Sequence, residues 1–493
     1  MIDLRHRENK LAQIAKAMTF RDAVKNLWAR SPLIFYRYKG KISRFHECDR
    51  VGIVCEPLEW EAARDSAGEK FPLIFSWDFF SDFKTLYAQV PQPRLMMHKN
   101  NFNCDFADMS GNTENIYLSF VGVRSQNVLY SFSIKDSADV LQSVSVSDAS
   151  SIIYGSNRIV NSHKVFFSSG IVTSSDIWFS SDLTSCKFCW NCHNMEYASY
   201  CIDNIAYTPE VYTQKIAMIR QKMLPEDYHN TTIGHLCIGS TDCTGCDRCI
   251  KCSHLENSLN AYQISEGKNV FFCSSTLWSK GMYNTYLTGN ASEVYTIMHS
   301  GGEIEYAYIC LAANNCSHVY YSVMLQSCSY CLGCIALKNQ SFCIFNKQYS
   351  KEEWYEKVNE IFSKMEQEWT FWQFFPATMN PFYFNDTAAY LIDPSFSKEE
   401  VMKEWYLRRD EEIKVDIPEW AEVLEAKDFW AYQRYDADGK WQINPEIMKK
   451  VIKDHKWDYY KIVKMEYDFL MKYWLPLPQL HRLERIKLWF KFK

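Results

Sequence analysis

The stretch KVFFSSGIVTSSDIWFSSDLTSCKFCWNC, residues 164–192, contains the repeat from which the fold can be predicted. Val165, Ile177 and Cys189 follow one another in it at intervals of twelve residues. The segments around them are short, apolar or aromatic, and are bounded by Ser, Gly and Asp, a pattern typical of short strands between turns. Because a fixed interval lets each coil stack on the last with the same residue types in register, we predict a β-solenoid.

The interval extends well beyond this stretch. Towards the N-terminus it continues through Ile116, Val128, Val140 and Ile152, with one extra residue between Ile152 and Val165. Further along the chain it runs through Val270, Met282 and Val294 and, after one extra residue, through Ala307, Val319 and Cys331. Midway positions are also apolar: Ile134, Val146, Ile171 and Leu183. This six-residue beat leaves open a helix with three hexads per coil, but the large residues recur mostly at multiples of twelve, which favours two strands per coil.

The chain also contains an internal duplication. SCKFCWNCHNMEYASYCIDN, which begins at Ser185, and SCSYCLGCIALKNQSFCIFN, which begins at Ser327, have cysteines at identical spacing. A helix is predicted after each copy, with Thr208 as N-cap of the first and a capping box of Ser350 and Glu353 on the second. We therefore predict two tandem solenoid units of about twelve residues per coil, each capped by a helix that covers its open strand edges.

The predicted fold class is α+β, mainly β, with helical flanking regions at both ends. The expected domains are a mixed helical region over 1–89, a first solenoid unit over 90–231, a second over 232–371 and a Trp-rich helical region over 372–493. A further capping box, Ser397 and Glu400, lies in the last region.

The cysteines allow two interpretations. In the first, they are small hydrophobes that fill a narrow coil where leucine would overpack. In the second they bind zinc, and the candidate ligands are Cys186, Cys189, Cys192 and Cys201, Cys328, Cys331, Cys334 and Cys343, and Cys243, Cys246, Cys249 and Cys252. The last set could also hold an iron–sulfur cluster. Disulfide or redox use stays a third alternative, and the packing interpretation is the one we favour.

Composition narrows the setting of the protein. The net charge of −5 gives no basic field for nucleic acid, and no run of eighteen apolar residues would span a membrane. The N-terminus has no apolar signal core, so we expect a cytoplasmic protein whose 19 cysteines are reduced. His46, Cys48 and Cys55 form an incomplete ligand set near the N-terminus. At the C-terminal end the basic residues Arg482, Arg485, Lys487, Lys491 and Lys493 suggest either a solvated helix end or a contact with phosphates or acidic protein surfaces.

One segment of the chain resembles the signature of a known protein family. GCIALKNQSFCIFNKQYSKEEW, residues 333–354, resembles the signature GCxxLxNxxYCIxNKQY[ST]KEE of a large family from the small genomes of candidate-phylum bacteria, which has no established activity. FFPATMNPFYFNDTAAY and LPLPQLHRLERIKLW are similar to further segments of that family. The resemblance implies Cys-, Asn- and Tyr-rich repeats flanked by zinc ribbons. In this chain only Cys55 plausibly matches a ribbon cysteine, Leu58 stands at its partner position, and the C-terminal segment has no cysteine, which puts flanking zinc in doubt.

Three classes of function follow. We favour a non-enzymatic scaffold or binding protein with a protein partner. Columns of aromatic residues would line its binding surface, unless these residues are simply core. The candidates are Tyr130, Tyr154, Phe167, Phe179 and Tyr320. The second class is nucleic-acid binding, suggested by the ribbon-bearing relatives. The third is a solenoid enzyme acting on carbohydrate or acyl groups, but the carboxylates Asp136, Asp139, Asp148, Asp176 and Asp182 lie at turns, and His163, His193 and His299 are isolated. No catalytic residue or cofactor is assigned, and zinc is the metal considered besides the iron–sulfur alternative.

Overall fold

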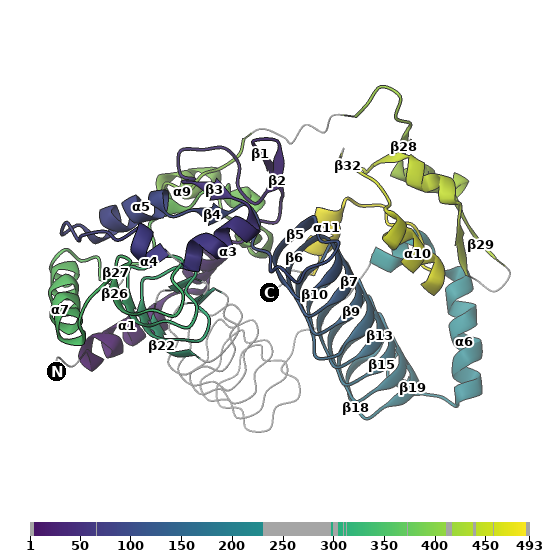
Figure 1. Ribbon diagram of the computed structural model, residues 1–493. Coiled ribbons are helices and arrows are strands. Elements are labelled where there is room, and N and C mark those ends of the chain that lie inside the picture. The colour runs from purple at the N-terminus through teal and green to yellow at the C-terminus, as the bar shows by residue number, and fades with distance from the viewer. Residues whose placement is uncertain are drawn as a thin grey trace. The chain divides into compact units, whose positions relative to one another are not determined.

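The structure is a computed structural model that describes residues 4–65, 67–229, 297–298, 304–308, 310–311, 313–371, 373–410, 417–436, 440–456 and 458–489. These residues form two compact units (Figure 1). Unit 1 contains residues 4–99 and the described residues of 297–410. Unit 2 contains residues 100–229 and the described residues of 417–489.

Unit 2 is built on a β-solenoid (Figure 1). Its strands are β5 (Phe106–Gly111), β6 (Glu114–Val123), β7 (Gln126–Leu129), β8 (Phe132–Lys135), β9 (Ala138–Leu141), β10 (Val144–Ser147), β11 (Ser151–Tyr154), β12 (Asn157–Val160), β13 (His163–Phe166), β14 (Ser169–Val172), β15 (Ser175–Trp178), β16 (Ser181–Thr184), β17 (Lys187–Trp190), β18 (His193–Glu196), β19 (Ser199–Ile202) and β20 (Ile205–Ala206). The odd-numbered strands from β7 to β19 form one parallel ladder and the even-numbered strands from β8 to β18 form another. The long strand β6 pairs with both β7 and β8 and joins the two ladders.

The register confirms coils of about twelve residues with two strands each. In the odd ladder Val165 pairs with Ile177, which pairs with Cys189. In the even ladder Ile171 pairs with Leu183. The midway apolar positions therefore belong to the second strand of the same coil, and the alternative with three hexads per coil is wrong.

The extra residue lies one turn earlier than predicted. Val140 pairs with Ile153 and not with Ile152, so the inserted residue precedes β11. It sits in the turn after β10, where Asp148 and Ala149 are both left-handed, with φ of 55° and 57°. Two adjacent isoleucines made the two registers indistinguishable by hydrophobicity alone.

A three-residue period underlies the coil. From Ser162 to Cys192 every third side chain is buried, and from residue 161 to 191 the residue before each of these has a positive φ. Four inward positions per coil thus alternate between a strand face, filled by Val, Ile, Leu or Cys, and a corner, filled by Ser or Cys. The left-handed residue before each inward position turns the backbone, so that a narrow coil closes in twelve residues.

The corner serines satisfy buried backbone groups. Ser168 Oγ donates to the Phe166 carbonyl (2.8 Å) and accepts from the Ser180 N–H of the next coil (3.1 Å). The same pair of bonds recurs at Ser156 and Ser174. A corner without a side-chain acceptor would leave a buried N–H unpaired, which costs about 1–3 kcal/mol.

The solenoid of unit 2 ends in a two-residue turn at Asp203 and Asn204, after which β20 pairs antiparallel with β19. The Asn204 amide accepts from the His193 N–H (2.7 Å) and donates to the His193 carbonyl (2.9 Å) on the edge strand β18. Helix α6 (Pro209–Lys222) follows, with the predicted Thr208 cap. Its Tyr212 packs on Trp190 and Ile202.

Unit 1 contains parallel strands with the same register. Ala307, Val319, Cys331 and Cys343 are paired in sequence through β22 (Ile304–Tyr308), β24 (Cys316–Tyr320), β25 (Ser329–Leu332) and β26 (Ser341–Ile344). Asn346 bonds to both backbone groups of Ile335, as Asn204 does to His193. Strand β27 (Lys347–Gln348) and helix α7 (Lys351–Gln367) follow, and the predicted capping box at α7 is confirmed. Val270, Met282 and Val294 lie outside the described residues.

The rest of unit 1 is mixed. Its N-terminal elements are α1 (Arg5–Ala17), α2 (Phe20–Ala23), a π-helix η1 (Val24–Trp28), β1 (Tyr36–Tyr38), β2 (Lys41–Ser43), β3 (Val54–Cys55), α3 (Pro57–Asp65), α4 (Ala67–Lys70), α5 (Phe79–Gln89) and β4 (Gln92–Pro93). The later ones are β21 (Ile297–Met298), β23 (Cys310–Leu311), the 3-10 helices η3 (Ala377–Met379) and η4 (Phe384–Asp386), α8 (Ala388–Ile392) and α9 (Lys398–Lys403), which has the predicted Ser397 cap. Among the described residues no helix combines the length and the apolar character needed to cross a membrane.

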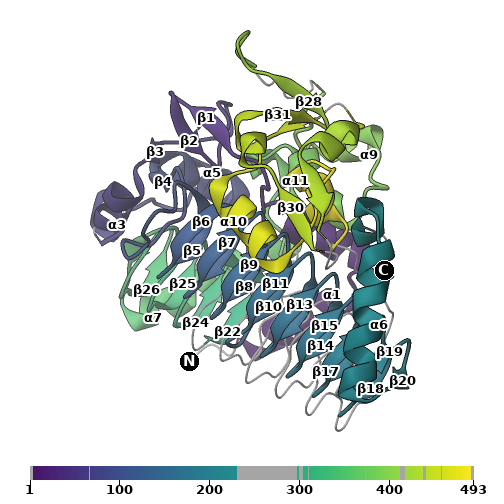
Figure 2. The ribbon, with the colours of Figure 1, turned by 90° about the vertical axis from the view of Figure 1, so that its right-hand side faces the viewer.

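The C-terminal segment of unit 2 covers one outer face of its solenoid (Figure 2). Besides the 3-10 helix η2 (Pro225–His229), the elements are β28 (Val423–Glu425), the 3-10 helix η5 (Ala426–Ala431), β29 (Gln433–Tyr435), β30 (Trp441–Ile443), the 3-10 helix η6 (Pro445–Lys449), β31 (Val451–Lys453), β32 (Tyr459–Tyr460), α10 (Lys464–Tyr473) and α11 (Arg482–Lys487). Phe469 of α10 stacks on Tyr154 (5.7 Å between ring centroids), and Tyr473 meets Phe166. This segment contains strands as well as the expected helices.

Candidate binding site

The cysteines face the inside of the coils. Eight of the twelve candidate metal ligands are described, and all eight are buried free thiols: Cys186, Cys189, Cys192, Cys201, Cys328, Cys331, Cys334 and Cys343. The spacing C-x2-C-x2-C equals the three-residue period, so it marks three successive inward positions. Cys189 pairs with Cys201 one coil on, as Cys331 does with Cys343. Cys243, Cys246, Cys249 and Cys252 lie outside the described residues.

The thiols are hydrogen-bonded to one another and to carbonyls. A hydrogen bond with Cys186, a second with Cys192, and burial together raise the pKa of Cys189. Burial also raises the pKa of Cys201, and the hydrogen bond with Cys328 heads the causes that raise that of Cys331. Within the described residues no group of three or more His, Cys, Asp or Glu side chains is arranged to hold a metal ion. Zinc at these cysteines stays a prediction.

His46 and Cys55 of the incomplete N-terminal ligand set contact other residues. The His46 ring stacks on Tyr383, with 4.0 Å between centroids. The Cys55 thiol donates to the Gln92 carbonyl (3.5 Å) between β3 and β4, and burial raises the pKa of Cys55 to about 11. These side chains therefore pack the N-terminal region.

The aromatic columns are core and do not line an open surface. Tyr130, Tyr154 and Phe167 are at most 6% exposed, and Tyr320 is 1% exposed. Phe179 lies against Phe167 and Tyr228. The columns are also composed differently from the prediction, because Tyr154 pairs with Phe166 and not with Phe167. As a binding surface, this set of aromatic residues is ruled out.

The basic C-terminal helix is partly buried, contrary to both sequence interpretations. Arg485 is 2% exposed and donates to Glu466 Oε1 (2.6 Å), which also accepts from Gln142 (3.1 Å). Burial alone would lower the pKa of Arg485, but the Glu466 carboxylate outweighs it and the pKa is raised. Burial lowers the pKa of Arg482 to about 10. Arg485 is thus paired within unit 2, while Lys491 and Lys493 lie outside the described residues.

The candidate carboxylates lie at left-handed positions of the coils. Asp136, Asp139, Asp148, Asp176 and Asp182 all have positive φ, a conformation that Asp tolerates better than most residues. Asp136 pairs with Arg124 (2.5 Å). Burial raises the pKa of Asp182 to about 6. His163 and His193 each bond a serine one coil back, and His299 lies outside the described residues.

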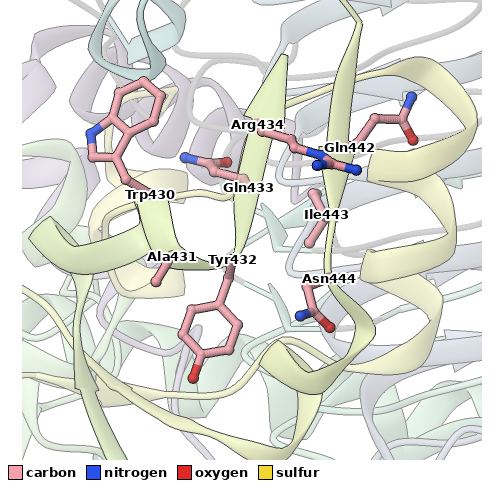
Figure 3. Close-up of a pocket in the computed structure, with 8 residues that line it drawn as sticks. All are labelled: Trp430, Ala431, Tyr432, Gln433, Arg434, Gln442, Ile443 and Asn444. Atoms are coloured by element: carbon pink, nitrogen blue, oxygen red, sulfur yellow. The ribbon is translucent and has the colours of Figure 1, made fainter. Parts of the chain in front are cut away.

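A pocket of about 450 Å³ opens beside the hairpin of β29 and β30 in unit 2 (Figure 3). It is lined by Trp430, Ala431, Tyr432, Gln433, Arg434, Gln442, Ile443 and Asn444. Trp430 is 53% exposed, and none of the described residues that line the pocket is acidic. Strands β29 and β30 pair only with each other, so each keeps one open edge among the described strands. Sequence analysis missed this site because its residues follow no repeat.

Gln433 is the buried polar group of this pocket. It is 3% exposed, and its Oε1 accepts from the Leu477 N–H (2.7 Å), which fixes the orientation of the amide. Its Nε2 is buried and has no hydrogen-bond partner within the described residues.

Unit 1 has a pocket of about 490 Å³ at the end of α1, next to Phe374 and Pro376. Its cation, Lys25, already pairs with Glu404 (2.8 Å) and Asp22 (3.5 Å). The lysine of this pocket is therefore already paired with two carboxylates of unit 1.

Comparison of the chain with protein-family models, curated proteins and solved structures gave no match. The structure itself must therefore supply the argument for function.

Proposed function

We propose that the protein is a non-enzymatic β-solenoid scaffold that binds protein partners through exposed tryptophans at helix ends. Three helices end in the same motif: Thr370, Tyr406 and Leu475 each donate their N–H to the carbonyl five residues back. The residue before each donor is left-handed, and it is Trp369, Trp405 and Trp474 in turn. Glycine is the usual residue at this position of a Schellman motif.

These tryptophans are unfavourable for folding and exposed to solvent. They are 72%, 69% and 42% exposed for Trp369, Trp405 and Trp474. A side chain in the left-handed conformation costs about 1–2 kcal/mol relative to glycine. Strain of this kind is commonly kept where it serves a function, and tryptophan is the residue most enriched at the energetic centres of protein interfaces. The repeated choice of exposed Trp over Gly is the observation that supports the proposal.

The experiment is affinity capture with the immobilised full chain, quantified by mass spectrometry against the triple variant W369G/W405G/W474G. The expected result is a protein retained by the wild type and lost by a variant that is at least as stable in urea. The matched control is W420A, which removes an 80% exposed tryptophan outside the left-handed region. Equal retention by the wild type and the triple variant would contradict the proposal.

The proposed architecture has two duplicated solenoid units, each capped by a helix, within the domain boundaries 1–89, 90–231, 232–371 and 372–493. The shared asparagine at the last turn and the shared capped helix support the duplication. Membership of the candidate-phylum family and a cytoplasmic location belong to the same proposal. Separate expression of residues 90–231, followed by a cooperative unfolding test, would examine the first boundary pair.

A further inference from the structure

Helices α6 and α7 dock in the same way on the last coils of their units. Tyr212 of α6 meets the Tyr200 ring edge-on, with 5.7 Å between centroids and 76° between the ring planes. Trp354 of α7 meets Phe342 at 6.1 Å and 74°. Both residues of the second pair follow those of the first at the same interval along the chain. The two helices therefore turn equivalent faces outwards, and their residues can be compared at this interval.

In unit 1 the outer face of α7 is covered by helix α1. Arg7 of α1 donates to Asn359 Oδ1 (2.6 Å) and to Ser363 Oγ (2.7 Å). Arg7 and Lys10 both pair with Glu366, at 3.2 and 3.3 Å. The three residues of α7 follow one another by four and three positions, so they share one face of the helix. Helix α1 thus lies along that face.

The equivalent face of α6 is uncharged and open to solvent. Ala217, Gln221 and Leu224 stand at the three positions that contact α1 in α7, and all three are exposed. Leu224 is 52% exposed, Met218 beside this face is 55% exposed and Val211 is 38% exposed. Large apolar side chains exposed on one surface commonly mark an interaction site.

We infer that the outer face of α6 binds an amphipathic helix of a partner protein, in the place that α1 takes on α7. The partner helix packs apolar side chains on Met218 and Leu224, and it needs no cation at its centre because α6 has no equivalent of Glu366. No helix within the described residues covers α6 in this way, so the occupant is assigned to another chain. The inference rests on the proposed scaffold function and duplication, and it adds a surface that contains none of the helix-end tryptophans.

The test presents the immobilised full chain with a displayed library of helix-forming peptides about 18 residues long, which is enough for an isolated helix. One face of each peptide is randomised among apolar, neutral polar and charged residues. We expect enrichment of peptides with an apolar stripe at positions i, i+3, i+4 and i+7. Enrichment of basic stripes, or no enrichment at all, would overturn the inference.

Variants assign the contact to α6. Met218→Glu/Leu224→Glu introduces the residue type that α7 has at both equivalent positions. Because both side chains are exposed, the variant should unfold at the same urea concentration as the wild type, but the enriched peptides should bind at least about tenfold more weakly. The matched control, Ile53→Glu/Ile74→Glu, makes the same change at two apolar residues of unit 1 that are 52% and 75% exposed, and it should bind like the wild type. Unchanged affinity in Met218→Glu/Leu224→Glu would overturn the inference.

Two further outcomes separate this surface from other occupants and from the tryptophans. A concentration-dependent dimer in sedimentation, absent from Met218→Glu/Leu224→Glu, would assign the face to a second copy of the chain and overturn the partner helix. Peptide binding that is lost in W369G/W405G/W474G but kept in Met218→Glu/Leu224→Glu would reject α6 and retain the scaffold function.

Discussion

The inner and outer faces of the solenoid in unit 2 follow different rules. Inside, each position has its neighbours one coil away, so Ser168 bonds Ser156 and Ser180, and the same bonds recur at Ser156 and Ser174. Outside, the aromatic face is determined by a distant segment, and Gln142 meets Glu466 across 324 positions of sequence. The inner face repeats one set of bonds, whereas the outer face keeps a buried ion pair in which Glu466 Oε2 and Arg485 Nη2 have no hydrogen-bond partner within the described residues. In the repeats, one hydrogen-bond pattern pairs the corner groups of successive coils. In the covering segment, each buried polar group needs a partner of its own.

The largest effect should come from breaking the outer ion pair. Arg485→Met leaves the Glu466 carboxylate buried, and the free energy of unfolding should fall by about 3–5 kcal/mol in urea titrations. The double variant Arg485→Met/Glu466→Gln should recover much of this loss, because the remaining amide is neutral. A loss under about 1 kcal/mol in the single variant would show that the pair is not buried in solution.

The second effect is a pH dependence of the same outer face. Burial lowers the pKa of His481 from 6.5 to about 3. Between these values the unfolded chain binds a proton that the folded chain does not, so stability should fall as the pH drops from 6.5 towards 3. The slope should reach at most about 1.4 kcal/mol per pH unit.

The control for this pH effect is His481→Asn, which keeps a side chain suited to the N-cap of α11 and has no titrating group. Its stability should not show the His481 contribution between pH 6.5 and 4. An identical slope in both proteins would assign the effect to other groups.

The third effect tests the inner corners. Ser168→Ala removes the acceptor for the Ser180 N–H, and we expect a loss of about 1–3 kcal/mol in thermal or urea unfolding. Ser168→Cys should cost less, because cysteine fills the same corner at Cys186 and Cys192, where the thiols donate to carbonyls at 3.3 Å. Equal losses would mean that sulfur does not substitute for the hydroxyl.

The smallest effect distinguishes core packing from metal binding. If Cys189 fills space, Cys189→Val should change stability by less than about 1.5 kcal/mol. Its zinc content by mass spectrometry should equal that of the wild type. A coupled loss of zinc and stability would favour the tetrathiolate instead.

The difference between the two faces also explains which parts of the fold can be predicted from the sequence. The interval between Val165 and Ile177 predicts the coil because stacked neighbours repeat the same environment. The spacing of Cys186, Cys189 and Cys192 equals the three-residue period of the inward positions. Interpreting these cysteines as metal ligands does not reveal that period. The apolar pattern does not distinguish Ile152 from Ile153, so it predicts the register one residue away from the observed one.

The outer face left no such signal in the sequence. The sequence predicts Arg485 as part of a solvated or phosphate-binding tail, since nothing near it in sequence indicates that it lies over the Tyr130 ring and pairs with Glu466. The pocket at Gln433 was missed for the same reason, because its donor becomes notable only when the Leu477 N–H is seen to occupy the other side of the amide.

The asparagine at the last turn has a consequence for assembly. A stack of parallel strands at about 4.8 Å spacing has the geometry of an amyloid filament, and an open last coil would template the addition of further chains. By occupying both backbone groups of His193, Asn204 removes one docking point for an incoming strand, and the antiparallel β20 blocks the neighbouring strand. One amide side chain thus acts as a chain terminator and helps to keep a polymer-like fold at a finite length.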